Sequence, residues 1–186
     1  SINEEVIQDV IAKLEATKIT PATINRHLSA IKTLLRYKKQ QWDYIKLRKE
    51  PKGRIRVLTK MEENQVLDII RGIKLNTRND FYPETADLIG LLVDTGMRLS
   101  EGLQLKYEDV SFTSNLISIW VNKGEKPRSV PMTKRVKTML EARMTINKVR
   151  PFTITKHQAG HAWNWARKHM GLTTDKEFVI HALRHT

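Results

Sequence analysis

The stretch PETADLIGLLVDTGMRLSEGLQL, residues 83–105, carries the strongest structural signal in this chain. Pro83 suits the first turn of a helix, and a strongly apolar run through Val93 follows it. Gly96 then suits the left-handed residue that ends a helix. We predict that this helix lies at the centre of the fold and that the chain reverses direction at Gly96.

Helical periodicity and capping signals extend on both sides of this stretch. Upstream they predict a helix over roughly 3–17, another starting at Thr20-Pro21, and a third after Thr59. Downstream the apolar period changes to two over 116–132, which indicates a β-hairpin. Two more helices are expected, one from Thr133 and one over 155–170. The predicted fold class is therefore mainly α with a small antiparallel β-sheet.

A change of composition divides the chain. Residues 49–57 combine Pro51 and Gly53 with a run of charges, which is typical of a linker. The sequence thus predicts a partial helical domain over 1–48 and a second domain over 58–186.

The composition favours a polyanionic partner. The 186 residues carry a formal net charge of +13, concentrated in two basic blocks, 18–60 (+11) and 116–186 (+10). The absence of Cys excludes disulfides, thiolate zinc sites and cysteine nucleophiles, and is consistent with a reducing cytoplasm. No apolar run approaches the roughly 20 residues of a membrane span, so no membrane partner is expected.

Five residues form a set that suits phosphodiester chemistry. Arg98 follows the reversal at Gly96, with Glu101 one helical turn further on. Lys123 is at the predicted hairpin tip, and His181 and Arg184 are three residues apart. Singly, each is most simply a surface residue. Together, two arginine forks suit the charged oxygens of a phosphate, a lysine can protonate a leaving alkoxide, and a histidine can exchange a proton near neutral pH.

Other candidate sites have a weaker basis. His157 and His161 have the spacing of a helical zinc site, but Gln158 stands where such a hydrolase needs a glutamate base, so we expect no metal. Trp163 and Trp165 are expected to pack in a core or at a subunit contact rather than to stack on bases.

Three segments in this order resemble the signature stretches of the tyrosine recombinase family, of the phage-integrase type. They are TGMRLSEGLQLKYEDV (95–110), ISIWVNKGEKPRSVPMT (117–133) and HALRHT (181–186). Residues 20–45 are also similar to the last helices of that family's core-binding domain. The resemblance implies an α+β catalytic domain preceded by a helical core-binding fragment.

The resemblance also implies a role for each candidate residue. Arg98 and Arg184 would clamp the scissile phosphate, with Glu101 supporting Arg98. Lys123 would protonate the 5′ oxygen, and His181 would exchange the nucleophile's proton. In this family a tyrosine attacks the phosphate, forms a 3′-phosphotyrosine and is displaced by a 5′ hydroxyl, without metal or any other cofactor.

The expected partner is double-stranded DNA. Five basic residues are the predicted contacts to it: Arg26, Lys32, Arg36, Lys126 and Arg128. The resemblance further implies a homo-tetramer on DNA for the full-length protein, a prophage or other mobile element as its source, and a place on the nucleoid in the cytoplasm.

The sequence departs from the family at the nucleophile, which lies downstream of the H-x-x-R segment in the family. All four tyrosines here, Tyr37, Tyr44, Tyr82 and Tyr107, lie upstream and match no nucleophile motif. We therefore expect a fragment that does not cleave DNA by itself. Two alternative functions stay open: a noncatalytic DNA-binding regulator and a type IB topoisomerase-like enzyme.

Overall fold

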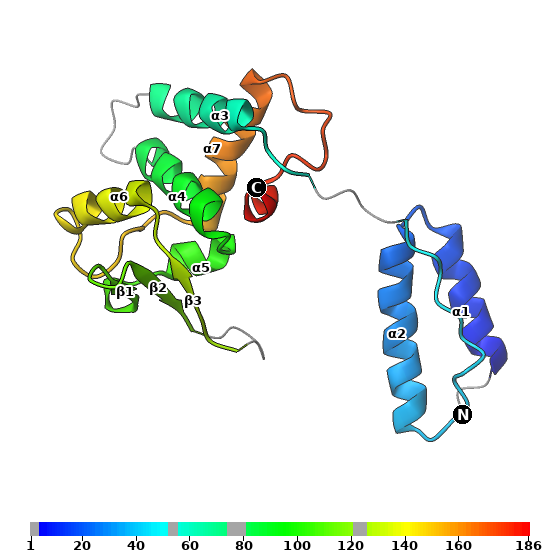
Figure 1. Cartoon of the computed structure of the whole chain (residues 1–186). Helices are drawn as coiled ribbons and strands as arrows, with labels where there is room; N and C mark the ends of the chain where they lie inside the picture. The colour runs from blue at the N-terminus through cyan, green and yellow to red at the C-terminus, as the bar shows by residue number, and fades with distance from the viewer. Residues whose placement is uncertain (1–3, 52–55, 74–80, 121–125) are drawn as a thin grey trace. The chain divides into compact units, whose positions relative to one another are not determined.

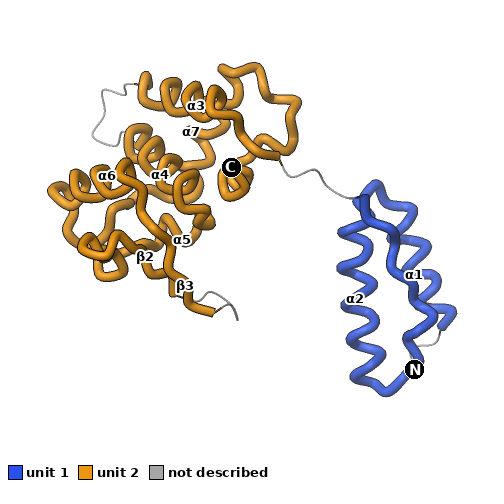
Figure 2. Tube along the Cα trace, in the orientation of Figure 1, with its two compact units in different colours: residues 1–54 blue, residues 55–186 orange. Residues whose placement is uncertain are grey.

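The chain forms two compact units, residues 1–54 and 55–186, which are coloured separately in Figure 2. The computed structural model describes residues 4–51, 56–73, 81–120 and 126–186. Each unit has an apolar core of its own.

Unit 1 is a pair of helices closed by an extended segment. Helices α1 (Glu4–Ala16) and α2 (Pro21–Tyr37) are shown in Figure 1. As predicted, Thr20 caps α2, accepting a hydrogen bond from the N–H of Thr23 at 3.3 Å. The core is made by apolar side chains from both helices and from the closing segment: Ile7, Ile11, Ile24, Leu28, Leu35 and Ile45.

A buried asparagine fastens the end of unit 1. The side chain of Asn25 accepts from the N–H of Arg48 at 2.7 Å, and its Nδ2 donates to the Arg48 carbonyl at 2.8 Å and to Glu50 Oε1 at 2.7 Å. Arg48 also pairs with Glu15 of α1. Residue 50, inside the predicted linker 49–57, is thus held by unit 1, because one amide satisfies the polar groups of this irregular segment.

Unit 2 is built around helix α4 (Tyr82–Thr95). Eight of its residues are buried, and most of the other helical elements of the unit pack against it. The predicted central helix is confirmed. The remaining helical elements are α3 (Lys60–Gly72), α5 (Leu99–Gln104), η1 (Tyr107–Asp109), α6 (Lys134–Met144), α7 (Lys156–His169) and η2 (Ile180–His185).

A three-stranded antiparallel sheet completes unit 2 in the order β1 (Val110–Ser111), β2 (Leu116–Ile119), β3 (Arg128–Pro131). Ile117 and Ile119 point into the core from alternate positions of β2, and Ile119 pairs with Arg128. The predicted fold class and the pairing of β2 with β3 are confirmed. The two-residue strand β1 is not predicted, since it is too short for a periodic signal.

Two predicted helix boundaries are confirmed by their geometry. Thr59 and Glu62 form a capping box at the start of α3, with the N–H of Glu62 donating to Thr59 Oγ1 at 3.2 Å and the N–H of Thr59 donating to Glu62 Oε2 at 2.8 Å. Gly96 ends α4 in the left-handed region at φ 63°. Among the described residues, no helix combines the length and apolarity needed to cross a bilayer.

The close approach of α5 to α4 depends on a glycine. A Cβ on Gly102 would lie 2.9 Å from Leu88 Cδ1 and 3.1 Å from Leu92 Cδ2, and both leucines are buried. We predict that Gly102→Ala lowers the free energy of unfolding by about 1–3 kcal/mol, the usual cost of overpacking a core. Equilibrium denaturation of the purified chain measures this change.

Gly160→Ala is the matched control, because Gly160 is also helical and its added Cβ meets no atom within 4 Å. This variant should gain up to about 1 kcal/mol from the better helix propensity of alanine. Equal effects of the two substitutions would contradict the close approach of α5.

Candidate functional site

Arg98 lies directly after the chain reversal that ends α4. The N–H of Gly96 donates to the carbonyl of Leu92 at 3.0 Å, and Arg98 returns to extended backbone as the residue before α5. A Cβ on Gly96 would lie 3.7 Å from the carbonyl oxygen of Arg184. The reversal that carries Arg98 and the helical turn that carries Arg184 are therefore adjacent, although they are far apart in sequence.

The buried carboxylate of Glu101 holds Arg98 and the start of β3 together. Glu101 Oε2 accepts from the Arg98 N–H at 2.7 Å and from Arg128 Nη2 at 2.6 Å, while Oε1 accepts from Arg98 Nη1 at 3.0 Å. Its side chain is only 4% exposed. One carboxylate thus fixes both the backbone and the guanidinium of Arg98. The pairing with Arg128 was not foreseen from the sequence.

Opposing effects set the ionisation of Glu101. Burial acts to raise the pKa of this carboxyl, but the Arg98 N–H and the guanidinium groups of Arg128 and Arg98 outweigh it, so the pKa lies below its usual range. Glu101 is therefore negatively charged at neutral pH, and the two arginines keep their partner.

His181 and Arg184 lie on η2, which is a 3₁₀-helix. Residues three apart eclipse one another in this geometry, so the two side chains project from the same side of the turn. His181 is exposed, and its ring centroid lies 5.6 Å from that of His185. Arg184 Nη1 is buried and has no hydrogen-bond partner among the residues that the structure describes. A buried N–H in that condition is energetically costly until an acceptor reaches it.

The hairpin residues are only partly covered by the structure. Lys123, the predicted general acid, lies outside the described residues. Lys126 is exposed, whereas the half-buried Arg128 is paired with Glu101. The predicted DNA contacts of Lys126 and Arg128 stay predictions.

The predicted contacts in unit 1 all lie on α2, and two of them share an aromatic support. Arg26 is exposed. The Lys32 ammonium lies 4.9 Å and the Arg36 guanidinium carbon 4.2 Å from the centre of the Trp42 ring. Lys32 Nζ also donates to the Ile45 carbonyl at 3.0 Å. Sequence reasoning missed this role of Trp42, although a tryptophan soon after a basic helix was a usable signal.

The weaker sequence candidates all lie on α7. The structure groups no set of three His, Cys, Asp or Glu side chains suited to a metal among its described residues. Trp163 is buried and donates to the Phe178 carbonyl at 3.0 Å, as expected for core packing. Trp165 is partly exposed on α7 beside His169.

The two tyrosines of unit 2 are occupied by structural contacts. Tyr107 is buried and donates to the Leu140 carbonyl at 3.1 Å, and the hydroxyl of the buried Tyr82 lies 3.3 Å from His161 Nδ1. Tyr37 and Tyr44 belong to unit 1.

A cavity of about 250 Å³ opens between α5 and β2. Glu101 and Asp109 both line it, and Asp109 accepts from Trp120 Nε1 at 2.6 Å. Two carboxylates make this cavity unsuited to a phosphate.

Comparison with known proteins decides the family. The sequence profile described as the phage integrase family matches residues 56–186, which is nearly all of unit 2. The chain belongs to the phage integrase family. The resemblance inferred from the three signature stretches is thereby confirmed.

Curated relatives of this integrase-family chain are named tyrosine recombinases. It is 28% identical over 133 residues to tyrosine recombinase XerA of Pyrococcus furiosus, covering 70% of this chain and 44% of that protein. It is 31% identical over 139 residues to tyrosine recombinase XerA of Thermococcus onnurineus, covering 72% and 46%. The chain thus spans about half the length of these relatives.

Solved structures share the fold. The XerH site-specific recombinase, bound to its difH substrate in a pre-cleavage complex, matches with a TM-score of 0.74 and 22% identity, over 100% of this chain and 58% of that one. The Tn1549 transposon integrase in complex with circular intermediate DNA matches with a TM-score of 0.74 and 19% identity, over 100% and 73%. At these identities the likeness establishes the fold.

The lowered pKa of Glu101 predicts how its contribution to stability varies with pH. A carboxyl whose pKa is depressed on folding stabilises the protein above its unfolded pKa, and this contribution is lost as the pH falls through the folded value. We expect Glu101→Gln to lower the free energy of unfolding at pH 7 by about 1–3 kcal/mol, since a charge-assisted network loses its anion. The difference from wild type should vanish as the pH falls well below 4.5, the ordinary value.

Denaturation at a series of pH values measures the difference. Other carboxyls with lowered pKa values, such as Glu63, are present in both proteins, so their contributions to the pH dependence cancel in the difference. A difference that is independent of pH would contradict the network.

Proposed function

We propose that this chain is part of a site-specific DNA recombinase, or integrase, which breaks and rejoins DNA through a 3′-phosphotyrosine intermediate. Membership of the phage integrase family supports the proposal. The single structural observation that carries it is the adjacency of the Arg98 and Arg184 segments, with a buried Arg184 Nη1 that lacks a partner among the described residues.

The proposed chemistry assigns one task to each group. Arg98 and Arg184 donate hydrogen bonds to the nonbridging oxygens, where negative charge grows in the transition state. A tyrosine hydroxyl attacks phosphorus and loses its proton to His181, and the P–O bond to the 5′ oxygen breaks. Lys123 protonates that oxygen. The energy of the phosphodiester is kept in the phosphotyrosine bond, so rejoining needs no cofactor, and the nucleophile would come from outside these 186 residues.

The fixed position of Arg98 favours this role over a general basic surface. Glu101 binds both its N–H and its guanidinium, so the side chain loses little freedom when it meets a phosphate. A nonspecific contact would not need a buried carboxylate behind this arginine. Preorganised charge is the arrangement that transition-state stabilisation requires.

Unit 1 would grip the same duplex through α2. Lys32 and Arg36 rest on the Trp42 ring, which limits their conformations while leaving their charge available. We infer that the full-length protein assembles as a homo-tetramer on double-stranded DNA and works on the nucleoid in the cytoplasm.

Arg98→Ala tests the catalytic assignment. In the full-length gene product we expect DNA cleavage to fall by about 10³-fold or more, the scale for a charge-stabilising arginine in phosphoryl transfer. Trapping of the covalent protein–DNA complex on nicked DNA measures this loss.

Arg150→Ala is the control, because it removes an exposed arginine that lies outside the proposed clamp. Near-normal trapping by Arg98→Ala would reject the recombinase and topoisomerase chemistries together and favour a noncatalytic DNA-binding regulator. Joining between two specific sites, as opposed to relaxation without site preference, separates a recombinase from a topoisomerase.

The grip of unit 1 makes a separate prediction about salt. Each phosphate contact contributes about −0.9 to the slope of log K against log salt concentration. Changing both Lys32 and Arg36 to Ala should therefore flatten the slope by about two units. Filter binding or fluorescence anisotropy with duplex DNA and the 186-residue chain gives the slope.

The paired control changes Lys13 and Lys18 to Ala, which removes the same charge from exposed positions of unit 1. Lys13 is 78% exposed and pairs only loosely with Asp9 at 3.4 Å. Equal slopes for the two double variants would place Lys32 and Arg36 off the interface.

A further inference from the structure

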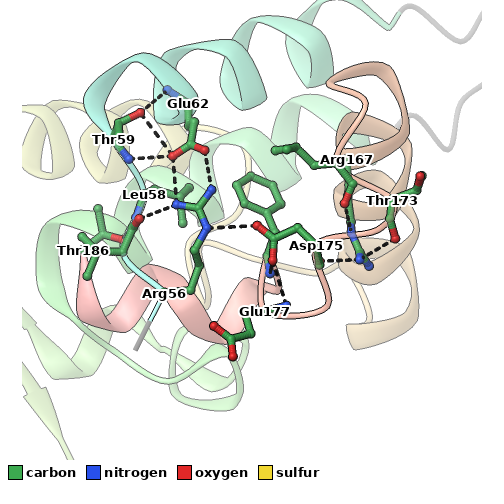
Figure 3. Close-up of polar contacts among 12 residues, drawn as sticks. Arg56, Leu58, Thr59, Glu62, Arg167, Thr173, Asp175, Glu177 and Thr186 are labelled. Carbon is green, nitrogen blue, oxygen red and sulfur yellow. Dashed lines mark hydrogen bonds and ion pairs between the residues drawn. The ribbon is translucent and has the colours of Figure 1, made fainter. Parts of the chain in front are cut away.

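The first described residues of unit 2 lie against the segment that carries His181 and Arg184. Figure 3 shows Arg56 and Leu58 beside the loop of Asp175 and the end of η2. The N–H of Leu58 donates to Thr186 Oγ1 at 3.1 Å, and that hydroxyl donates to the Ala182 carbonyl at 3.2 Å. The entry of the chain into unit 2 is thus attached to η2.

Arg56 makes the strongest of these attachments. Its Nη1 donates to Glu62 Oε2 at 3.1 Å and its Nη2 to Glu62 Oε1, while Nε donates to Asp175 Oδ2 at 3.1 Å (Figure 3). The guanidinium also lies over the Phe178 ring, 5.2 Å from its centre. A planar guanidinium that contacts Glu62, Asp175 and Phe178 at once is held in one orientation. A lysine ammonium could not make the same set of contacts.

The partners of Arg56 in turn shape the loop before η2. Asp175 Oδ1 accepts from the N–H groups of Glu177 at 3.0 Å and Phe178 at 3.1 Å. Phe178 is buried and stacks on Trp163 at 4.9 Å. Arg167 grips the same loop from α7, donating to three of its carbonyls. The loop is therefore bound by two arginines, Arg167 from α7 and Arg56 from the beginning of unit 2. Of these two, Arg56 is the one that connects the loop to the beginning of the unit.

The Arg56 cluster suits positioning better than stabilisation. The side chains of Arg56, Glu62 and Asp175 are 22%, 16% and 29% exposed. Ion pairs this close to water change a folding equilibrium by about fivefold at most. A displacement of about 1 Å at a reacting centre, in contrast, costs about 100-fold in rate. The arginine lowers the pKa of both Glu62 and Asp175 through its hydrogen bonds, so all three groups stay charged at neutral pH.

We propose that Arg56 is a positioning residue for the phosphate-binding turn η2. By joining Asp175 to the capping box of α3, it makes the chain entry of unit 2 and the turn with His181 and Arg184 one rigid body. The consequence for DNA cleavage rests on the proposed function. The positioning of η2 does not, and it is measured separately.

Hydrogen exchange of the 186-residue chain tests the positioning. Arg56→Lys keeps the charge but loses the fork, and Asp175→Asn keeps the loop-capping oxygen but loses the acceptor for Arg56. Each should speed exchange of the η2 amides by up to about fivefold, with the α4 amides unchanged. The double variant should add little to either single change, because both break the same contact.

Arg143→Lys is the matched control. Arg143 also bridges two carboxylates, at 2.8 Å to Glu84 and 3.0 Å to Asp87, and lies over Phe152 at 5.3 Å. Its side chain is 11% exposed, so losing its fork should disturb the fold more than losing that of Arg56. Its partners lie on α4, so the α4 amides are expected to respond, but the exchange rates of the η2 amides should stay unchanged.

A second readout follows cleavage in the full-length gene product. In a single-turnover reaction on nicked DNA, Arg56→Lys should lower the cleavage rate by about 10- to 100-fold while DNA affinity changes little. Faster exchange at η2 in a protein that never cleaves DNA would support the positioning and refute the proposed function.

Two results would overturn the proposal. One is unchanged exchange at η2 in Asp175→Asn, which decides the matter if Arg56→Lys does not fold. The other is an equal rise at η2 in Arg143→Lys, which would mean that Arg56 acts only through overall stability.

Discussion

Helix α4 imposes the main constraint on unit 2, because nearly every side of it must be kept from water. Eight of its fourteen residues are buried, so a single covering layer is not enough. Helices α3, α5, α6, α7 and the turn η2 all contact it. The need to bury α4 therefore determines how the other elements of the unit are arranged.

The position of the candidate site is determined by the C-terminal end of α4. At Gly96, which lies beside the carbonyl of Arg184, the chain leaves α4, and Arg98 follows at the boundary between core and solvent. Glu101, one turn into α5, is buried by the same packing and turns toward Arg98. Rigid hydrophobic packing thus supports a polar site whose groups come from distant parts of the sequence.

Local signals explain what the sequence predicted correctly. The end of α4 at Gly96, the capping box of Thr59 and the pairing of β2 with β3 each depend on neighbouring residues, so they are visible in a single sequence. The partners of Arg56 and Arg128 and the contact of Trp42 with two cations are set by tertiary packing. The spacing of residues along the sequence does not predict such pairs. From the sequence alone, Arg128 is therefore interpreted as a surface residue that contacts DNA.

The same packing engages many of the arginines in contacts within unit 2. Several cations of the basic block 116–186 are held by carboxylates or carbonyls of unit 2, among them Arg128, Arg135, Arg143 and Arg167. Asp94 and Glu63 both bind Arg135, for example. Pairing leaves the net charge of +13 unchanged, because that total already counts the carboxylates. It does mean that the positive charge offered to a polyanion comes mainly from other cations than these arginines.

Burial of Arg184 Nη1 carries an energetic cost in the folded protein. A buried donor with no acceptor among the described residues costs on the order of 1–3 kcal/mol, which an acceptor at hydrogen-bond distance would remove. Since a ligand that binds only the folded state also stabilises it, occupancy and stability are thermodynamically linked at this nitrogen. Under the proposed function, a phosphate that accepts a hydrogen bond from this nitrogen would therefore raise the free energy of unfolding as it binds.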